Sequence, residues 1–533
     1  MCRSSIAMNL SILPRHLRVL LFCAATTATA GAEEADTVRP RYSMDLTLDA
    51  DAHRIHCVSR ITVPAAADDP LDDAVFHLPA IAACGGDPAA PPPLEIVGVR
   101  FGGSPVPWTV DQAALRVRLP APQTRPFGLE IDFRGTLPRI LPTAKEPPGG
   151  EKPAPEEKGK DNYVDYGLFG YGNDILSLGS HWYPQLAVRH AGSWAGSGKP
   201  GPGDLLHTQA SDFTVTFGGV PEGATVVATG TGDGRVFRAN GARDFAVLIS
   251  NKFVSRHAVI KLGGKPVRVS SYARIANANQ LTTTVEIATA ALRIFNRRFG
   301  PYPFDELKIV EAPLRGGSGG MEYSGVASVA GGQYTTLTRA MRKLPWTKDS
   351  GRDDFRKHVR AWYECVLVHE IAHQWWAIQV GNDSQLHPFV DEALTQWSMT
   401  LYFEDRYGAE RGREIRKMYL ADTFVSLIDV GARDAPANQP TSSYRDDGQY
   451  SAVIYCKGAL FYQKLREMTG DEVFFGGLRD YYRRFGGRIA GPNDLRDVMI
   501  ARAPDRQADI AALYQRWVGG AHGVEDICDA EPQ

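Results

Sequence analysis

The stretch VHEIAHQWW, residues 368–376, decides how the rest of the sequence is interpreted. It places Glu370 between His369 and His373 with the spacing H-E-x-x-H. On a helix the two imidazoles project from one face, which is the geometry needed to hold a single zinc ion. Glu370 can then reach the open position of the metal and accept a proton from bound water. The alternative is an ordinary helix with solvated or buried histidines, but with 13 histidines in 533 residues the pattern should arise by chance only about 0.02 times.

A third protein ligand is expected soon after this helix, because a catalytic zinc usually has three and leaves a fourth position to water. Glu392 follows His373 by 19 positions, in the stretch FVDEALTQW at residues 389–397. A short loop and an antiparallel helix would bring this carboxylate back to the metal, and two histidines with one glutamate suit Zn²⁺. Asp391 and Glu404 remain competing candidates, with a helix start and a solvated helix face as their alternative roles.

The stretches HEIAHQWW (369–376) and DEALTQW (391–397) together resemble the gluzincin aminopeptidases that include aminopeptidase N. The stretch GGMEYSG at residues 319–325 resembles the G-A-M-E-N exopeptidase motif of that family, with Gly320 in place of Ala and Tyr323 in place of Asn. The resemblance implies a thermolysin-like catalytic domain, one Zn²⁺ per chain, and peptides with a free N-terminus as substrates.

Residue roles follow from the same resemblance. It implies that Glu322 binds the α-amino group of the substrate, while the backbone of Gly319, Gly320 and Met321 pairs with the substrate main chain. A fixed carboxylate suits a terminal ammonium group because the hydrogen bond is charge-assisted. Small residues also let a peptide approach a strand edge closely. Taken alone, this glycine-rich stretch would be interpreted as a flexible loop.

The stretch YSAVIYCKGALFY at residues 450–462 resembles the family's Tyr-x-Lys-Gly segment. The resemblance implies that Tyr455 donates a hydrogen bond to the developing oxyanion, although a tyrosine in an apolar run is more often a core residue. The family's stretch that contributes a glutamine to the first substrate pocket is not recognisable; residues 176–186 take its place, with Gln185 as a weak candidate.

Hydrophobic periodicity divides the chain into a β-rich part and a mainly helical part. Residues 38–272 contain runs with period two, typical of half-buried strands; the alternating residues are Tyr42, Met44, Leu46 and Leu48, then Leu115, Val117 and Leu119, then Leu129, Ile131 and Phe133, then Phe213, Val215 and Phe217. Within them, residues 141–161 are rich in Pro, Gly and charge and are predicted to be a mobile surface loop. The fold class is therefore an N-terminal all-β domain followed by an α+β, mainly helical domain over residues 273–533.

In the second part, four helices and one short strand are predicted from spacing and stop signals. They are a helix at 281–300, a strand at 307–311, a long helix running to about residue 380 with Gly381 as its stop, a helix from about 391 to 408, and a helix at about 451–469 ending at Gly470.

The first 32 residues are predicted to be a cleavable export signal, with positive charge at Arg15 and Arg18 and a short apolar run ending in small residues. That run is too short to span a bilayer, and no later run is long enough. A periplasmic or secreted protein is expected. Cys57 and Cys84 could form a disulfide there, and free buried thiols are equally compatible.

Composition excludes some partners. The net charge of -2 and the absence of a basic stripe make nucleic acid a poor partner. The resemblance extends over about residues 38–520, and because the sequence ends at Gln533 a short form without the family's large C-terminal helical domain is expected.

The sequence thus favours a zinc aminopeptidase over two alternatives. One is a zinc endopeptidase of related fold, which has no need for an ammonium-binding residue such as Glu322. The other is a non-catalytic peptide-binding protein, which needs neither Glu370 nor Tyr455.

Overall fold

The computed structural model describes residues 39–83, 92–140, 166, 168–196, 201–315, 318–341 and 350–528. Residues 1–32, the loop 141–161 and Cys84 lie outside these ranges, so the export signal, the mobile loop and the Cys57–Cys84 pairing stay predictions. From Arg39 onward the chain forms one compact unit. Within the described ranges, every helix is too short or too polar to cross a membrane.

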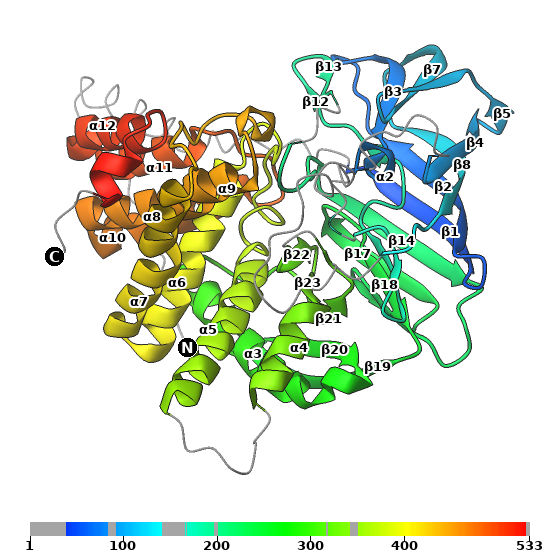
Figure 1. Ribbon diagram of the computed structural model, residues 1–533. Coiled ribbons are helices and arrows are strands. Elements are labelled where there is room, and N and C mark those ends of the chain that lie inside the picture. Colours follow the sequence, from blue (N-terminus) through cyan, green and yellow to red (C-terminus); the bar gives the residue numbers. More distant parts are fainter. Residues whose placement is uncertain are drawn as a thin grey trace, which may run out of the picture. The chain divides into compact units, whose positions relative to one another are not determined.

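The first part of the chain forms β-sheets, as its period-two pattern predicts (Figure 1). In β1 (Arg41–Asp49), every second residue is buried, and these include Tyr42 and Leu48. This alternation arises because one face of the sheet packs on the core and the other faces solvent. The largest sheet has the strand order β16-β17-β14-β1-β2-β8-β4-β5. Its other strands are β2 (Arg54–Val63), β4 (Leu94–Phe101), β5 (Ser104–Pro105), β8 (Phe127–Thr136), β14 (Ser211–Gly218), β16 (Thr231–Gly232) and β17 (Val236–Ala242).

Smaller sheets complete this part, with the orders β11-β3-β7-β6, β15-β18-β10-β9 and β12-β13. Their strands are β3 (Leu71–His77), β6 (Trp108–Asp111), β7 (Ala114–Gln123), β9 (Gly170–Gly172), β10 (Ile175–Gly179), β11 (Gln185–Leu186), β12 (Arg189–His190), β13 (Ser193–Trp194), β15 (Thr225–Ala228) and β18 (Val247–Ser250); α2 spans Pro79–Ala83. Side chains from the largest sheet and from β3 and β7 share one apolar core, which contains the buried Trp182 and Phe245.

A five-stranded sheet joins the β-rich and helical parts of the sequence. Its order is β19-β20-β21-β23-β22, so among the described strands β22 forms one edge and pairs with β23 alone, antiparallel to it. The strands are β19 (Phe253–Leu262), β20 (Lys265–Arg274), β21 (Glu306–Ala312), β22 (Gly320–Tyr323) and β23 (Val326–Ala330). β21 confirms the strand expected at 307–311. The glycine-rich stretch thus becomes an edge strand, which leaves one row of backbone groups available to a partner.

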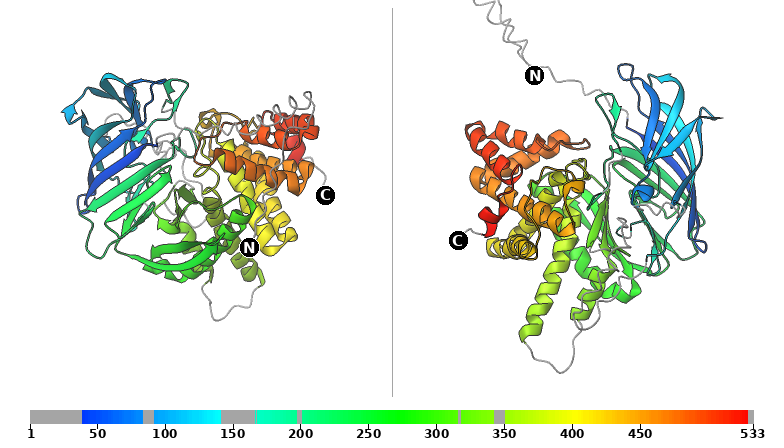
Figure 2. Two further views of the ribbon diagram at one scale, coloured as in Figure 1. Left: turned by 180° about the vertical axis from the view of Figure 1, so that it is seen from behind. Right: turned by 45° about the horizontal axis from the view of Figure 1, so that its top comes forward.

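Helices make up the remainder, and the views of Figures 1 and 2 show the orange and red ones packed against one another. They are α3 (Leu281–Arg298), α4 (Gly331–Met341), α5 (Ser350–Ala372), α6 (Leu394–Tyr407), α7 (Ala409–Arg416), α8 (Asp422–Asp429), α9 (Asp447–Tyr450), α10 (Ala459–Phe485), α11 (Asp494–Arg502) and α12 (Gln507–Trp517). The predicted fold class, β-rich first and mainly helical second, is confirmed. The domain boundaries stay a prediction.

The long helix ends earlier than its sequence pattern predicts. α5 stops at Ala372 rather than near residue 380, because tertiary contacts replace the helical hydrogen bonds. Ala377 has a φ of 103°, which no α-helix accommodates, and its N–H bonds to the carbonyl of Val380 at 2.9 Å. The indole of Trp375 donates to the carbonyl of Gly300 at 3.0 Å. The expected stop at Gly470 is a break instead, since Gly470 has a φ of 78° inside α10.

Candidate active site

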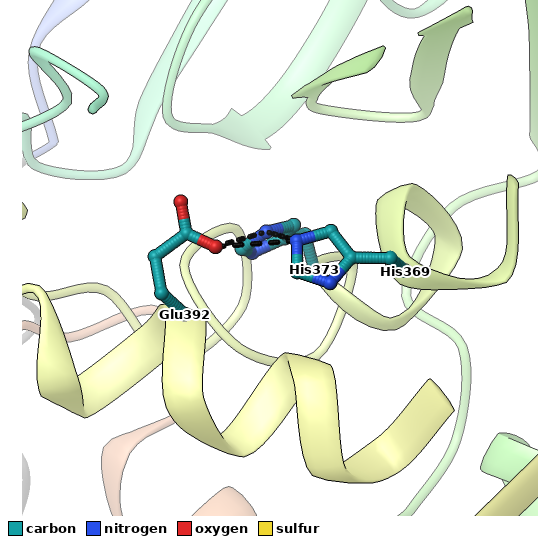
Figure 3. A group of neighbouring side chains, drawn as sticks. All are labelled: His369, His373 and Glu392. Atoms are coloured by element: carbon teal, nitrogen blue, oxygen red, sulfur yellow. Dashed lines mark hydrogen bonds and ion pairs between the residues drawn. The ribbon is translucent and has the colours of Figure 1, made fainter. Parts of the chain in front are cut away.

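Three predicted ligands meet in one place (Figure 3). His369 lies in the last turn of α5, His373 follows directly after it, and Glu392 lies in the π-helical turn η3 (Phe389–Ala393) that leads into α6. Nε2 of His373 is 3.1 Å from Nε2 of His369, and Oε2 of Glu392 lies 3.2 Å from Nε2 of His369 and 3.4 Å from Nε2 of His373. Three donor atoms within 4.8 Å of one another can hold a single metal ion.

The other ring nitrogen of each histidine contacts a carbonyl-type oxygen. Nδ1 of His369 lies 2.8 Å from Oε1 of Gln396, and Nδ1 of His373 lies 2.9 Å from the main-chain oxygen of Trp376. Both oxygens only accept, so each Nδ1 must carry the proton. The Nε2 lone pairs then point at the shared position, which is the tautomer that a zinc ligand requires.

Replacing Gln396 with Leu is expected to weaken zinc binding about 10- to 100-fold, because His369 loses the acceptor that fixes its tautomer and orientation. Competition with a chromogenic chelator measures the affinity. Gln515→Leu, an exposed glutamine in α12, serves as the matched control. An unchanged zinc affinity in the Gln396 variant would show that this hydrogen bond does not orient the ligand.

Charge in the site favours a cation. Burial alone would raise the pKa of Glu392, but hydrogen bonds and charges from both histidines outweigh it and lower that pKa. Burial opposes charging of His373, yet the neighbouring Glu322, Glu392 and Glu370 raise its pKa well above the usual range. The pKa values of Glu322 and Glu370 are raised by burial first. A divalent ion at the three ligand atoms would offset this concentration of carboxylates.

Glu370 packs against the edge strand. A Cβ on Gly320 would lie only 2.5 Å from Cγ and Cδ of Glu370, so any larger residue there must displace the carboxyl group. This gives a physical reason for the glycine that stands where the resembled motif has alanine. Beside it, a Cβ on Gly319 would lie 3.1 Å from the side chain of Val366. β22 therefore lies directly along α5, and the side chain of Glu370 lies beside Gly320, the first residue of β22.

Glu322 is only 6% exposed, and its Oε1 has no hydrogen-bond partner among the described residues. This oxygen lies 3.7 Å from Nδ1 of His373, next to the three ligands. An unpaired carboxylate oxygen in a buried position is costly unless a ligand satisfies it. The position therefore suits a positively charged hydrogen-bond donor.

Gln374 holds the hairpin that carries Glu322. Its Nε2 donates to the carbonyl of Tyr323 at 2.9 Å, and its Oε1 accepts from the N–H of Gly325 at 2.9 Å. Oδ1 of Asp244 accepts from the N–H of Ser324 between them at 2.8 Å. Because Gln374 directly follows His373, one side chain ties the strand of Glu322 to the metal ligands.

Replacing the buried Gln374 with Leu is expected to raise KM about tenfold for substrates with a free N-terminus, because a displacement of about 1 Å at a binding group is enough for such losses. Zinc content should not change. The loss of two buried hydrogen bonds will also lower the melting temperature. An unchanged KM for peptides with a free N-terminus, despite a lower melting temperature, would contradict a role through Glu322.

A cavity of about 470 Å³ contains the whole site. It is lined by the residues to which the sequence analysis assigned a role in the site: Gly319, Gly320, Met321, Glu322, His369, Glu370, His373, Glu392 and Tyr455. The ring of Tyr455 stacks beside His369 with centroids 5.7 Å apart, and burial raises the pKa of its hydroxyl. Nζ of Lys457 lies 2.7 Å from Oδ1 of Asp434, and this buried ion pair fixes the segment that carries Tyr455.

The two competing ligand candidates lie elsewhere. Asp391 accepts from Oγ of Ser384 at 2.8 Å and from the N–H of Glu392 at 2.8 Å, so it anchors the turn that presents the neighbouring ligand. Glu404 pairs with Arg416 and Arg466 at 3.0 Å and 2.8 Å. Neither carboxylate belongs to the three-residue metal cluster.

Tyr166, Asp204 and Tyr450 are among the lining residues that the sequence does not indicate. Asp204 comes from the segment before β14, and burial together with Asp391 and Glu392 raises its pKa to about 7. Its surroundings, GPGDLL, carry no periodicity or metal-ligand spacing that could have signalled it. Gln185, the weak candidate for the first substrate pocket, does not line the cavity. It lies in β11, and its Nε2 donates to the carbonyl of Ser180 at 2.6 Å.

Known proteins resemble parts of this chain. Residues 283–517 match the domain described as Peptidase family M1. Aminopeptidase 2, mitochondrial, from Saccharomyces cerevisiae is 24% identical over 258 residues, which are 48% of this chain and 25% of that protein. Aminopeptidase M1-C from Oryza sativa subsp. japonica is 24% identical over 259 residues, 48% of this chain and 27% of that protein. The matched region thus spans about a quarter of the length of these relatives.

Solved structures resemble nearly the whole chain. The M1 zinc metallopeptidase from Deinococcus radiodurans has a TM-score of 0.61 at 18% identity, covering 90% of this chain and 93% of that one. A mutant of that protein bound to a Tyr-Ser-Ala substrate has a TM-score of 0.59 at 19% identity, covering 93% and 95%. At this identity the likeness shows a shared two-domain fold. The chain thus combines a match to the Peptidase family M1 domain over residues 283–517 with a fold shared with M1 zinc metallopeptidases.

Proposed function

We propose that this protein is a zinc-dependent aminopeptidase that removes the N-terminal residue from peptides. The observation that carries the proposal is the position of Glu322: a buried carboxylate with an unpaired oxygen lies 3.7 Å from a residue of the metal cluster. A group placed there limits productive binding to peptides whose ammonium end reaches the metal. The relatives named as aminopeptidases and the solved structure bound to Tyr-Ser-Ala support this choice.

In the proposed reaction, the zinc ion held by His369, His373 and Glu392 would polarise the scissile carbonyl and acidify a water molecule. Glu322 binds the terminal ammonium group and sets which carbonyl is reached. Glu370 takes the proton of the attacking water and passes it to the leaving amine. The hydroxyl of Tyr455 donates to the tetrahedral oxyanion, a contribution on the order of 3 kcal/mol.

Hydrolysis of aminoacyl chromogenic amides, with and without a chelator, tests the proposal. We expect release of the chromophore that stops on metal removal and returns with added zinc. A panel covering all twenty first residues would also define the preferred one. If a zinc-loaded sample releases nothing from any amide, the non-catalytic binding alternative is favoured.

N-acetylated peptides separate the exopeptidase from the endopeptidase. The proposed enzyme cuts free peptides and leaves their acetylated forms uncut, because an acetylated amine cannot form the ion pair with Glu322. Equal cleavage of both, or cuts within long peptides, would support an endopeptidase instead.

We also propose that the protein is exported to the periplasm or secreted. Residues 1–32 carry the charge, apolar run and small residues of a cleavable signal. N-terminal sequencing of the protein recovered from cell fractions tests this. An unprocessed N-terminus in the cytoplasmic fraction would contradict it.

A further inference from the structure

We propose that Arg243 and Asp244, two adjacent buried residues of the β-rich part, position the two halves of the active site relative to each other. Arg243 holds the loop that orients the metal ligand His373, and Asp244 holds the hairpin that carries Glu322. The first role needs only the metal cluster, whereas the second rests on the proposed function, in which Glu322 binds the substrate ammonium group. Both residues lie between β17 and β18 and are only 2% and 1% exposed.

The guanidinium group of Arg243 binds main-chain oxygens from three separate segments. Its Nε donates to the carbonyl of Ile378 at 2.7 Å and its Nη2 to that of Gln379 at 3.2 Å, in the loop that follows α5. Nη1 donates to the carbonyl of Thr208, before β14, at 2.8 Å, and Nη2 also donates to the carbonyl of Arg488, after α10. Burial lowers the pKa of this guanidinium to about 10, so it stays protonated at neutral pH and these hydrogen bonds are charge-assisted.

The loop after α5 contains a strained residue and orients a metal ligand. Ala377 has a φ of 103°, a conformation that persists only where the surrounding contacts hold it. The carbonyl of the preceding residue, Trp376, lies 2.9 Å from Nδ1 of His373 and fixes the tautomer of that ligand. Arg243 binds the carbonyls of the two residues that follow Ala377. It therefore holds the turn in the shape that presents the Trp376 carbonyl to His373.

Gly381 shows how closely Arg243 fits this loop. A Cβ at Gly381 would lie 2.2 Å from Cζ of Arg243 and 2.5 Å from its Nε and Nη1. The N–H of Gly381 donates at 3.0 Å to the carbonyl of Arg488, which also accepts from Arg243. The φ of Gly381 is not positive, so the approach of the guanidinium, rather than the backbone conformation, requires a glycine here.

Asp244 binds the other half of the site. Its Oδ1 accepts from the N–H of Ser324 at 2.8 Å, and the N–H of Arg243 donates to Oγ of the same serine at 2.9 Å. Ser324 is buried in the turn between β22 and β23, two residues after Glu322. Because a rigid peptide unit joins Arg243 to Asp244, the loop beside His373 and the hairpin of Glu322 are tied at a fixed separation. A shift of about 1 Å between such groups is enough to impair binding.

Zinc affinity tests the role of Arg243 without any need for turnover. Arg243→Lys keeps the charge, but one ammonium group cannot bridge the carbonyls of three segments. Gly381→Ala keeps Arg243 and displaces its guanidinium. We expect each variant of the full-length protein to bind zinc about tenfold more weakly, measured by competition with a chromogenic chelator. If both act through the same contact, the double variant should lose no more affinity than Arg243→Lys alone.

Lys308→Met is the matched control for stability. Lys308 is another buried cation, 4% exposed, and its Nζ donates to the carbonyl of Gly230, so it too connects the β-rich part to the five-stranded sheet. Its loss should lower the melting temperature and leave zinc affinity unchanged. An unchanged zinc affinity in both Arg243→Lys and Gly381→Ala would overturn the role of Arg243, as would an equal loss in the Lys308 control.

The role of Asp244 is tested by KM and by hydrogen exchange. Asp244→Leu should raise KM for aminoacyl amides about tenfold with zinc affinity unchanged, and should speed amide exchange in residues 319–325. Asp244→Asn also removes the charge but keeps an acceptor for Ser324, so it should restore most of the KM. Ser324→Ala is a milder second variant if Asp244→Leu does not fold, and it should raise KM in the same direction.

The outcomes separate this inference from the proposed function. Wild-type KM and wild-type exchange in Asp244→Leu, or in Ser324→Ala where that variant replaces it, would overturn the role of Asp244. A rise in KM that follows the melting temperature equally in Asp244→Leu and Asp244→Asn would overturn it as well. If zinc affinity and exchange change as expected but the wild type hydrolyses no aminoacyl amide, the positioning pair stands and the aminopeptidase is overturned.

Discussion

Replacing Glu370 with Gln is expected to lower kcat by about a thousandfold or more while zinc stays bound. Glutamine keeps the shape of the side chain, which matters because Gly320 leaves no free space beside Cδ of Glu370. It cannot accept a proton from water, however, and Glu370 is not one of the three residues of the metal cluster. Turnover on the best aminoacyl amide and zinc content by atomic absorption measure the two halves of the prediction.

Glu467→Gln is a suitable control for that experiment, because it makes the same chemical change at a half-exposed position in α10. It should leave turnover unchanged. Loss of zinc from the Glu370 variant would mean that Glu370 contributes to metal binding, and full activity would assign the general base to another group. Asp204 would then be the next candidate, since it lies in the same cavity with a pKa raised to about 7.

The sequence predicts those parts of the fold that depend on neighbouring residues, and it does not predict those that depend on long-range contacts. The burial of β1 follows the sequence alternation residue by residue, because the sheet buries one face along its whole length. The end of α5 could not be found this way. Its signal lies in long-range contacts, such as that between Trp375 and Gly300, and in the unusual φ of Ala377. Local propensity gives no account of either.

The candidate site also has some features that follow from local sequence and others that depend on long-range contacts. Two histidines four residues apart at the end of α5 must lie close together, and the motif's spacing to Glu392 adds the third ligand. Asp204 and the clamp made by Gln374 depend on which segments the fold brings together across more than 100 and about 50 residues of sequence. No periodic pattern in the sequence predicts such contacts between distant segments. The sequence shows a glycine at position 320, but its close fit against Glu370 depends on how the fold places β22 beside α5.

Replacing Glu322 with Gln is expected to lower kcat/KM for peptides with a free N-terminus by about a hundredfold, equivalent to ~3 kcal/mol. The amide keeps the volume of the carboxyl group but loses the ion pair with the substrate ammonium. Most of the loss should therefore be in KM, and the preference for free over N-acetylated peptides should disappear. Zinc content should stay at one ion per chain. An unchanged preference for free peptides would remove Glu322 from ammonium recognition and with it the main support for an exopeptidase.

Combining Glu322→Gln with Gln374→Leu shows whether the two residues act as one unit. Gln374 has no contact with the substrate in this scheme; it acts by holding the hairpin that carries Glu322. Once the charge at Glu322 is gone, the position of the hairpin no longer affects ammonium binding. The double variant should then have nearly the same kcat/KM as Glu322→Gln alone, while its melting temperature falls by the full effect of the Gln374 change. If the losses in kcat/KM of the two single variants instead multiply in the double variant, Gln374 affects catalysis by a separate route, through its neighbour His373.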